Sequence, residues 1–189
     1  MRKALFDISL FRYDTQDWKE KKAEIISWSD EITMYRSEAN NFYSDKNPSQ
    51  RINENSFYMQ DFISLFEDKF ALFQDEAGLD SVSLTDVWFA EYEQGDCQLP
   101  HSHGSTGFTG ILYVNFDEEK HPPTMVIQPW SGILNDQTTM VNIYAKEGTL
   151  IIMPSNLLHF STPNKCSHKK TVISFDLKCT SQYILWHYN

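Results

Sequence analysis

The chain has 189 residues, a length that suits one domain, and its 16 Lys plus Arg against 26 Asp plus Glu give a formal net charge of −10. Hydrophobic residues make up 41% and aromatic residues 14%, which is enough to build a core and excludes a disordered chain. The excess of negative charge argues against nucleic-acid and anionic-membrane partners, because both attract clustered Lys and Arg.

The first 80 residues are predicted to be mainly helical. Residues 14–27 place Trp18 and Ile25 among charged residues, and Ser56–Glu76 places apolar residues three and four positions apart. The second pattern is typical of one long helix with an apolar face. The polar stretch Asn40–Asn55 is expected to be a loop. Helices that precede a run of strands are expected to support one face or edge of the β unit.

After residue 80 the pattern changes to short strands rich in Val, Ile, Thr and aromatic residues, with Gly and Pro between them. The expected strands are residues 86–93, 107–115, 125–128, 140–145, 149–153, 158–161, 170–178 and 182–187. Eight such strands predict a sandwich, jelly roll or barrel, and the fold class is α+β but mainly β. No linker divides the chain, so residues 1–189 are expected to form a single domain, with a helical N-terminal support over 1–80 and the β core over 81–189.

Cysteine usage and hydropathy point to a cytoplasmic protein. The three cysteines, Cys97, Cys166 and Cys179, are odd in number and widely spaced, which favours reduced thiols over a disulfide framework. No stretch approaches the roughly 20 apolar residues that a membrane span needs. The short apolar run at the N-terminus is interrupted by Asp7, which does not suit a signal peptide.

Three of the six histidines form a candidate metal site. His101 and His103 would point to the same face of an extended segment, about 6 to 7 Å apart at Cα. His159 follows a strand and a Pro-Ser bend, 56 residues after His103, which is far enough for a jelly roll to bring the two segments together. Two ligands from one segment and one from another are typical of sites that leave positions open for substrates and dioxygen. The remaining histidines, His121, His168 and His187, are expected to be ordinary imidazoles.

Over nearly half of its length the chain resembles the 2-oxoglutarate/Fe(II)-dependent oxygenase superfamily, and in particular a group of small members from bacteria and phages. The resemblance rests on an ordered set of short segments: Trp88, Gly95-Asp96, Pro100–His103, Thr109–Val114, Gln128-Pro129, Gly148–Ser155 leading to His159, and Lys170 before Ser174–Asp176. It implies a double-stranded β-helix, a jelly roll of the cupin type, with Fe(II) and 2-oxoglutarate at its open end.

The resemblance implies that His101 and His159 are metal ligands, while His103 stands where the family usually has Asp or Glu. Three neutral imidazoles leave the metal site at a charge of +2, whereas a carboxylate ligand would reduce it to +1. His103 is favoured as the third ligand. The alternative is that His103 only neighbours the ligands and water fills the third position.

The co-substrate needs a cation for its far carboxylate, because an unpaired buried charge costs several kcal/mol. The family uses Arg or Lys about ten residues after the distal histidine, a position that Lys169 or Lys170 can fill. Only one of the two can face inward on a strand, and Lys170 is favoured. Lys169 stays open because it shares a face with Thr171, which would add a hydroxyl. Tyr113 is a further candidate to hydrogen-bond the co-substrate.

The expected function is that of an Fe(II)- and 2-oxoglutarate-dependent oxygenase, a hydroxylase that couples decarboxylation of 2-oxoglutarate to oxidation of a small molecule or a side chain by O2. Two alternatives are a three-histidine cupin-type metalloenzyme that does not use 2-oxoglutarate, and a jelly-roll binding protein without enzymatic activity. Trp88 is expected in the core and Trp130 at a substrate entrance, which the loops Asn40–Asn55 and Ser131–Thr138 would shape. The primary substrate and the oligomeric state are left open.

Overall fold

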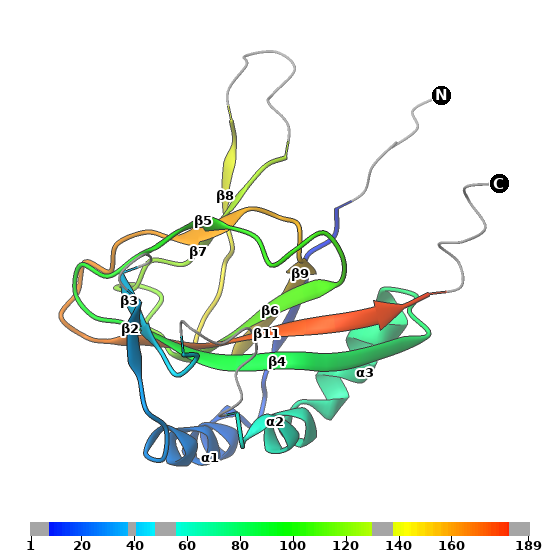
Figure 1. Cartoon of the computed structure of the whole chain (residues 1–189), viewed down its shortest axis with the longest axis horizontal. Coiled ribbons are helices and arrows are strands. Elements are labelled where there is room, and N and C mark those ends of the chain that lie inside the picture. Colours follow the sequence, from blue (N-terminus) through cyan, green and yellow to red (C-terminus); the bar gives the residue numbers. More distant parts are fainter. Residues whose placement is uncertain (1–7, 38–40, 48–55, 130–137, 182–189) are drawn as a thin grey trace.

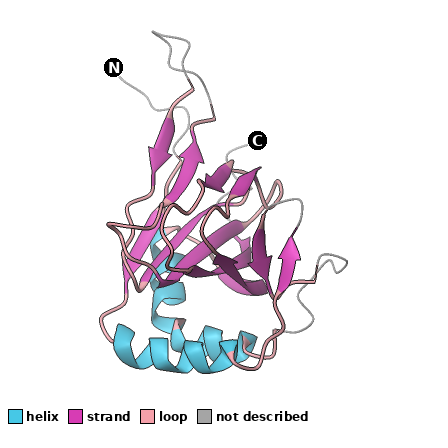
Figure 2. Ribbon diagram, turned by 90° about the vertical axis from the view of Figure 1, so that its left-hand side faces the viewer, coloured by secondary structure: helices cyan, strands magenta, loops and turns pink. Residues whose placement is uncertain are grey.

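Two antiparallel sheets stand opposite each other, and three helices cover the far face of the larger sheet (Figures 1 and 2). The computed structural model describes residues 8–37, 41–47, 56–129 and 138–181. The larger sheet contains, in spatial order, β1 (Phe11–Asp14), β9 (Thr149–Pro154), β6 (Phe108–Asn115), β11 (Lys170–Thr180), β4 (Ser81–Tyr92), β3 (Phe42–Ser44) and β2 (Tyr35–Ser37). The smaller sheet contains β5 (Gln98–His101), β10 (His159–Ser161), β7 (Thr124–Ile127) and β8 (Met140–Asn142). The predicted mainly β fold is confirmed.

The helices α1 (Trp18–Ser29), α2 (Met59–Leu65) and α3 (Glu67–Glu76) form one layer below the larger sheet (Figure 2). A cluster of aromatic rings joins this layer to the sheet, with Phe175 of β11 at 5.4 Å from the buried Phe62 and 5.7 Å from the half-buried Phe70 between ring centroids. Edge-on and tilted contacts of this kind add to the free energy gained by burying the rings. The helices therefore support the sheet, as predicted from their apolar faces.

The stretch Ser56–Glu76 differs from the prediction of one long helix. It forms α2 and α3, which are separated at Phe66, where φ is −120° and ψ is 18°. The ring of Phe66 is completely buried. Burial of this ring in the core fixes a bend that the spacing of apolar residues does not reveal, because both halves keep the same helical period.

Phe175 lies directly over Gly110 of the neighbouring strand β6. A Cβ atom at position 110 would lie 2.0 Å from Cζ of Phe175, a distance that no real pair of carbon atoms adopts. Gly110 is therefore required by the close approach of the ring, and not by a turn, because it lies inside the strand and its φ is not positive.

The segment before residue 81 also differs from the expected helical support, because it adds three strands to the larger sheet. β1 pairs with β9, with Phe11 opposite Ile152, and β3 pairs with β4 on one side and with the edge strand β2 on the other. These strands have three or four residues each, which is too short for an alternating pattern to be detected in the sequence. Phe11 and Tyr13 pack against the helix-side core, so β1 covers both the sheet edge and part of the helices.

The remaining strands agree with the prediction to within a few residues, with three exceptions. β4 begins at Ser81, five residues before the expected start, and β8 ends at Asn142, three residues before the expected end. The expected strand at 182–187 lies outside the described residues. None of the helices in the described part of the chain has the length and apolar character needed to cross a bilayer. The division into one domain stays a prediction.

Candidate metal centre

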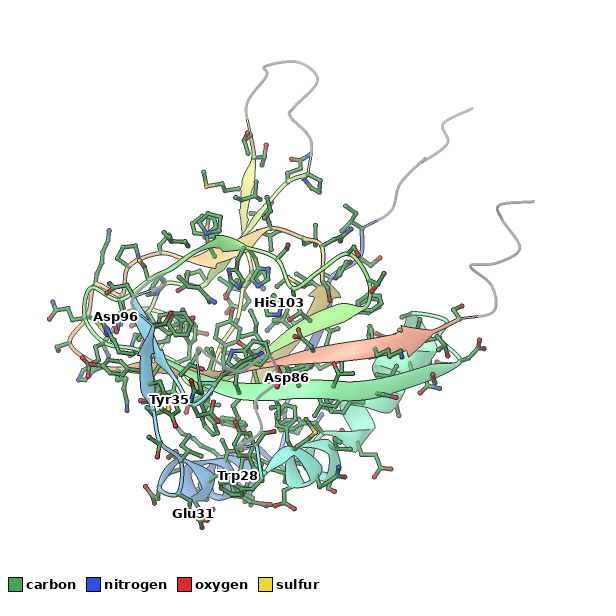
Figure 3. All side chains as sticks on the ribbon, in the orientation of Figure 1. Trp28, Glu31, Tyr35, Asp86, Asp96 and His103 are labelled. Carbon is green, nitrogen blue, oxygen red and sulfur yellow. The ribbon has the colours of Figure 1, made fainter. Side chains whose placement is uncertain are left out.

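Three imidazoles meet in the space between the two sheets. His101 ends β5, His159 begins β10, and the pairing of these strands sets the two residues opposite each other. The centroid of the His159 ring lies 4.4 Å from that of His101 and 5.1 Å from that of His103. One nitrogen from each ring lies within 4.8 Å of the others, a spacing that one metal ion can bridge. Figure 3 shows His103 in this space, above β4 and β11.

His103 reaches the cluster by a turn and not by continuation of the strand. The prediction placed His101 and His103 on one extended segment, whereas β5 ends at His101. The backbone N–H of His103 donates to the carbonyl of Ser155 at 2.8 Å, and Gly104 then turns the chain with a φ of 130°. The fold thus delivers the two imidazoles to one point, with 5.2 Å between their ring centroids.

Two backbone carbonyls orient the rings of His101 and His159. Nδ1 of His101 lies 2.9 Å from the carbonyl oxygen of Leu99, and Nδ1 of His159 lies 2.9 Å from that of Leu157. A carbonyl oxygen can only accept, so each Nδ1 carries the proton and each Nε2 keeps its lone pair, which in His101 accepts from the side-chain amide of Gln98 at 3.2 Å. Both rings therefore hold the tautomer that a metal ligand requires.

Burial keeps these two imidazoles neutral. It lowers the pKa of His159 to about 3 and also lowers the pKa of His101, and the neighbouring imidazoles add to the effect for both residues. A histidine must be neutral to bind a metal ion through nitrogen, so at neutral pH no proton competes for either Nε2.

His103 has a different partner on its Nδ1, namely a carboxylate. Nδ1 donates to Oδ1 of Asp176 at 2.7 Å, and the hydroxyl of Thr109 lies 3.1 Å away on the same nitrogen. The Thr109 hydroxyl donates its own proton to the carbonyl of Phe175 at 3.0 Å, so toward His103 it acts as an acceptor. The indole of Trp88 stacks on the imidazole at 5.5 Å between centroids and an interplanar angle of 19°. Nε2 of His103 is left to face Nε2 of His101 at 3.2 Å.

Lys170 carries a buried ammonium group into the cavity beside the histidines. Its side chain is 1% exposed, and Nζ donates to Oγ of Ser161 at 2.7 Å and to the carbonyl of Pro122 at 3.0 Å. Nζ also lies 4.7 Å from the centroid of the Tyr92 ring. Burial lowers the pKa of Lys170 to about 7. Among the described residues, no carboxylate forms an ion pair with this ammonium group.

The two other candidates on β11 do not line the cavity. Lys170, Val172 and Ser174 line it, whereas Lys169 and Thr171 do not. Nζ of Lys169 instead donates to Oε2 of Glu91 at 2.7 Å on the protein surface. The alternation of a strand explains the difference, because residues 169 and 171 point to the face opposite to residue 170.

Tyr113 lies behind the cavity wall. It is completely buried, and its hydroxyl donates to Oγ1 of Thr124 at 2.8 Å. Thr124 lines the cavity, whereas Tyr113 does not. Burial raises the pKa of the Tyr113 hydroxyl, so the group is a neutral donor at physiological pH.

Sequence reasoning assigned no role to Asp176 and placed Trp88 in the core. Trp88 is indeed 8% exposed, but its indole packs on His103. The signal for Asp176 was present in the sequence, since a residue six positions after Lys170 on one strand points to the same side. Trp130 lies outside the described residues, as do parts of both loops expected at the substrate entrance.

His121 and the cysteines lie outside the cluster of donor atoms, and His187 lies outside the described residues. Nδ1 of His121 accepts from the N–H of Asp117 at 2.9 Å, and Nε2 donates to the carbonyl of His168 at 3.0 Å. Cys97, Cys166 and Cys179 are free thiols.

Comparisons with known proteins agree with this geometry. Residues 86–176 match the model of a family described as putative 2OG-Fe(II) oxygenase, which spans all three histidines, Lys170 and Asp176. No protein of curated function matches the chain in sequence. The resemblance predicted from the short sequence segments is therefore confirmed by the family model.

Solved structures show the same fold at low sequence identity. A 2OG-Fe(II) oxygenase family oxidoreductase from Burkholderia pseudomallei has a TM-score of 0.67 at 11% identity, over 89% of this chain and 84% of that one. HygX from Streptomyces hygroscopicus, solved with nickel, 2-oxoglutarate and hygromycin B, has a TM-score of 0.67 at 7% identity, over 93% and 84%. A viral collagen prolyl hydroxylase from Paramecium Bursaria Chlorella virus-1 has a TM-score of 0.58 at 17% identity, over 89% and 94%. The predicted double-stranded β-helix is confirmed.

Proposed function

We propose that the protein is an Fe(II)- and 2-oxoglutarate-dependent oxygenase, a hydroxylase in its simplest form. The sequence of residues 86–176 matches the family that uses these two cofactors. The observation that carries the proposal is the joint presence, in one cavity, of three converging imidazoles and a buried ammonium group without a carboxylate partner among the described residues. The first feature fits a metal ion, and the second fits an anion bound beside it.

His101, His103 and His159 would hold the iron through Nε2. The orientation of His101 and His159 by backbone carbonyls supports this assignment, since both rings need no change of tautomer on binding. Bound Fe(II) supplies the redox chemistry by which R–H, O2 and 2-oxoglutarate become R–OH, succinate and CO2. The protein itself holds the ligands, excludes water and aims the substrate.

Lys170 would receive the far carboxylate of 2-oxoglutarate, with the Ser161 hydroxyl as a second donor. A buried ammonium group is costly to the fold, and an anionic ligand removes that cost. The free space in the cavity is about 10 Å³, room for about one water molecule, so the side chains that line it, Lys170 among them, must move to admit the co-substrate. A flexible lysine stem can make this movement.

The remaining candidates have smaller roles in the proposal. Tyr113 would act through Thr124, whose hydroxyl it holds in place at the cavity wall. No contact with the co-substrate is assigned to Lys169 or Thr171, because neither lines the cavity.

The proposed reactants are O2 and a small molecule or a side chain, and not a nucleic acid, because the chain has a net charge of −10. We propose a cytoplasmic location, which the three free cysteines and the need for reduced iron support.

The test is to add Fe(II) and 2-oxoglutarate to the protein without oxygen. We expect the weak visible charge-transfer band of an iron–keto-acid chelate, and succinate release once O2 is admitted. The His101→Ala/His159→Ala double variant should show neither signal. A wild-type protein that binds Fe(II) but gives neither the band nor succinate would favour the three-histidine metalloenzyme that does not use 2-oxoglutarate. A wild-type protein that binds no more metal than the double variant would favour a binding protein.

A further inference from the structure

The candidate metal centre has a carboxylate, but it lies one imidazole away from the cluster of donor atoms. His101, His103 and His159 are the only described residues whose donor atoms group closely enough to hold a metal ion. The nearest acidic partner is Asp176, whose Oδ1 lies 2.7 Å from Nδ1 of His103. Resting on the proposed function, we infer that Asp176 is a positioning residue that supplies the negative charge of the site through the imidazole of His103.

The position of Asp176 brings its carboxylate to the imidazole of His103. Asp176 lies on β11 opposite Asp86 of β4, and it faces the space between the sheets on the same side as Lys170. Stacking of Trp88 on the imidazole fixes the plane of the His103 ring. With the ring plane fixed and Nδ1 bound to a carboxylate, Nε2 has one direction available, which is toward His101. Asp176 therefore determines both the tautomer and the direction of the lone pair.

Asp176 also changes the net charge of the metal centre. Three neutral imidazoles leave a divalent ion at +2, whereas a site with two histidines and one carboxylate carries +1. A carboxylate hydrogen-bonded to a ligating imidazole increases the basicity of that ligand and brings a negative charge close to the ion. With Asp176 included, the net charge of this site is +1, the same as for a carboxylate-ligated site. The substitution of a histidine for the acidic ligand is thus compensated within the same cavity.

Asp176 is the acidic residue available for this role. The neighbouring Asp86 forms an ion pair with Lys46, so its charge is compensated locally. The Asp176 carboxylate pairs with the imidazole of His103, and no lysine or arginine among the described residues forms a salt bridge with it. Its side chain is 27% exposed, so the carboxylate keeps contact with water.

The experiment measures Co(II) binding to Asp176→Asn, which keeps the shape of the side chain and removes its charge. We expect the dissociation constant for Co(II) to rise about 10- to 100-fold, the range found when the hydrogen-bond partner of a ligating histidine is changed. The visible spectrum of the bound Co(II) should shift as the ligand field of His103 weakens. With iron, the reduction potential of the variant should be higher, because the lost negative charge stabilised Fe(III) more than Fe(II).

Two further variants separate this role from a structural one. Asp176→Glu retains the charge and should recover part of the Co(II) affinity. Asp86→Asn removes one negative charge at the position opposite Asp176, from a carboxylate that forms an ion pair with Lys46, so its Co(II) affinity should stay within about threefold of wild type. Circular dichroism of all three variants establishes that they are folded, and Asp176→Glu provides the charged comparison where Asp176→Asn is poorly folded.

The outcomes distinguish this inference from the proposed function. Tight Co(II) binding by wild type, its loss in His159→Ala and equal affinity in wild type and Asp176→Asn would overturn the role of Asp176 and leave the metal centre intact. Equal losses of Co(II) affinity in Asp176→Asn and Asp86→Asn would also overturn it, because the effect would then come from the loss of any nearby negative charge. Failure of the wild-type protein to bind Co(II) or Fe(II) would overturn the proposed function itself.

Discussion

Both faces of the larger sheet bury apolar residues, but only the face toward the smaller sheet also buries the polar residues of the candidate metal centre, and β11 shows the difference. On the helix side, β11 presents Ile173, Phe175 and Leu177 to a core of apolar side chains. On the other side, the same strand presents Lys170 and Asp176 to the candidate metal centre. Adjacent residues of one strand thus serve opposite purposes, since the apolar face gains free energy from burial whereas a buried ammonium group costs free energy.

This difference indicates that folding stability and ligand binding depend on different residues of β11. A change on the helix side should affect folding and leave the affinities of the site nearly unchanged. A change on the site side should affect binding, and it can even increase stability. The following substitutions test the separation, in order of decreasing effect.

His159→Ala should have the largest effect on the site. Loss of one of three ligands from a buried cluster should weaken Fe(II) or Co(II) binding by more than the roughly 100-fold that follows from loss of an outer hydrogen-bond partner. Calorimetric titration with Co(II) measures the affinity. The free energy of unfolding should change less in metal-free His159→Ala than in Phe175→Ala. Metal affinity close to wild type would remove His159 from the site.

Phe175→Ala should have the largest effect on stability. Its ring is completely buried against Phe62 and Phe70, and removal of such a ring costs about 3–5 kcal/mol of unfolding free energy. Urea denaturation measures this change. At a temperature where the variant is folded, its Co(II) affinity should lie within about threefold of wild type. A large loss of metal affinity in the folded variant would show that the two faces are coupled.

Lys170→Met should separate binding from stability most clearly. We expect the affinity for 2-oxoglutarate to fall about 100-fold, because the co-substrate carboxylate loses its charged donor. The ligand-free variant should be more stable than wild type by roughly 1–3 kcal/mol, because an apolar side chain replaces a buried ammonium group. Fluorescence titration and urea denaturation measure the two quantities. Lys169→Ala is the matched control, because this lysine lies on the surface beside Glu91 and should change neither quantity by more than a few tenths of a kcal/mol.

The affinity for 2-oxoglutarate should fall as the pH rises above neutrality. Burial lowers the pKa of Lys170 to about 7, so above that pH the ligand-free protein must first take up a proton to present an ammonium group. The dissociation constant should increase up to about tenfold per pH unit above 7 and vary little just below it. Titrations at pH 6.5, 7.5 and 8.5 measure this slope, and Lys170→Met should lack it.

The same depressed pKa gives a prediction for folding with the opposite sign. Between about pH 7 and the ordinary lysine value of 10.5, the unfolded chain binds the proton more tightly than the folded protein does. The free energy of unfolding should therefore rise with pH across this window. Below pH 7 the buried ammonium group of Lys170 should destabilise the fold by its full amount. The difference in unfolding free energy between wild type and Lys170→Met should shrink as the pH rises. A constant difference would contradict the lowered pKa.

The sequence was sufficient to predict the mainly β fold and the meeting of His101, His103 and His159, because strand punctuation and histidine spacing are local signals. It also favoured Lys170 over Lys169 as the contact to the co-substrate, which stays a prediction; of the two, only Lys170 lines the cavity. The bend at Phe66 and the short strands β1, β2 and β3 were not predictable, since tertiary packing and not a periodic pattern determines them. The partnership of Asp176 with His103 depends on the pairing of β11 with its neighbours, which a single sequence does not specify.

The pairing of β1 with β9 has a consequence for how the chain folds during synthesis. Phe11 cannot pair with Ile152 until Ile152 has left the ribosome, so this edge of the sheet forms only after most of the chain has been made. Contacts between residues so far apart in sequence form slowly, and until then β9 exposes an unpaired edge of apolar residues to other chains. Removal of residues 1–14 should make that exposure permanent, and the truncated protein should aggregate during expression even though every residue of the metal centre is present.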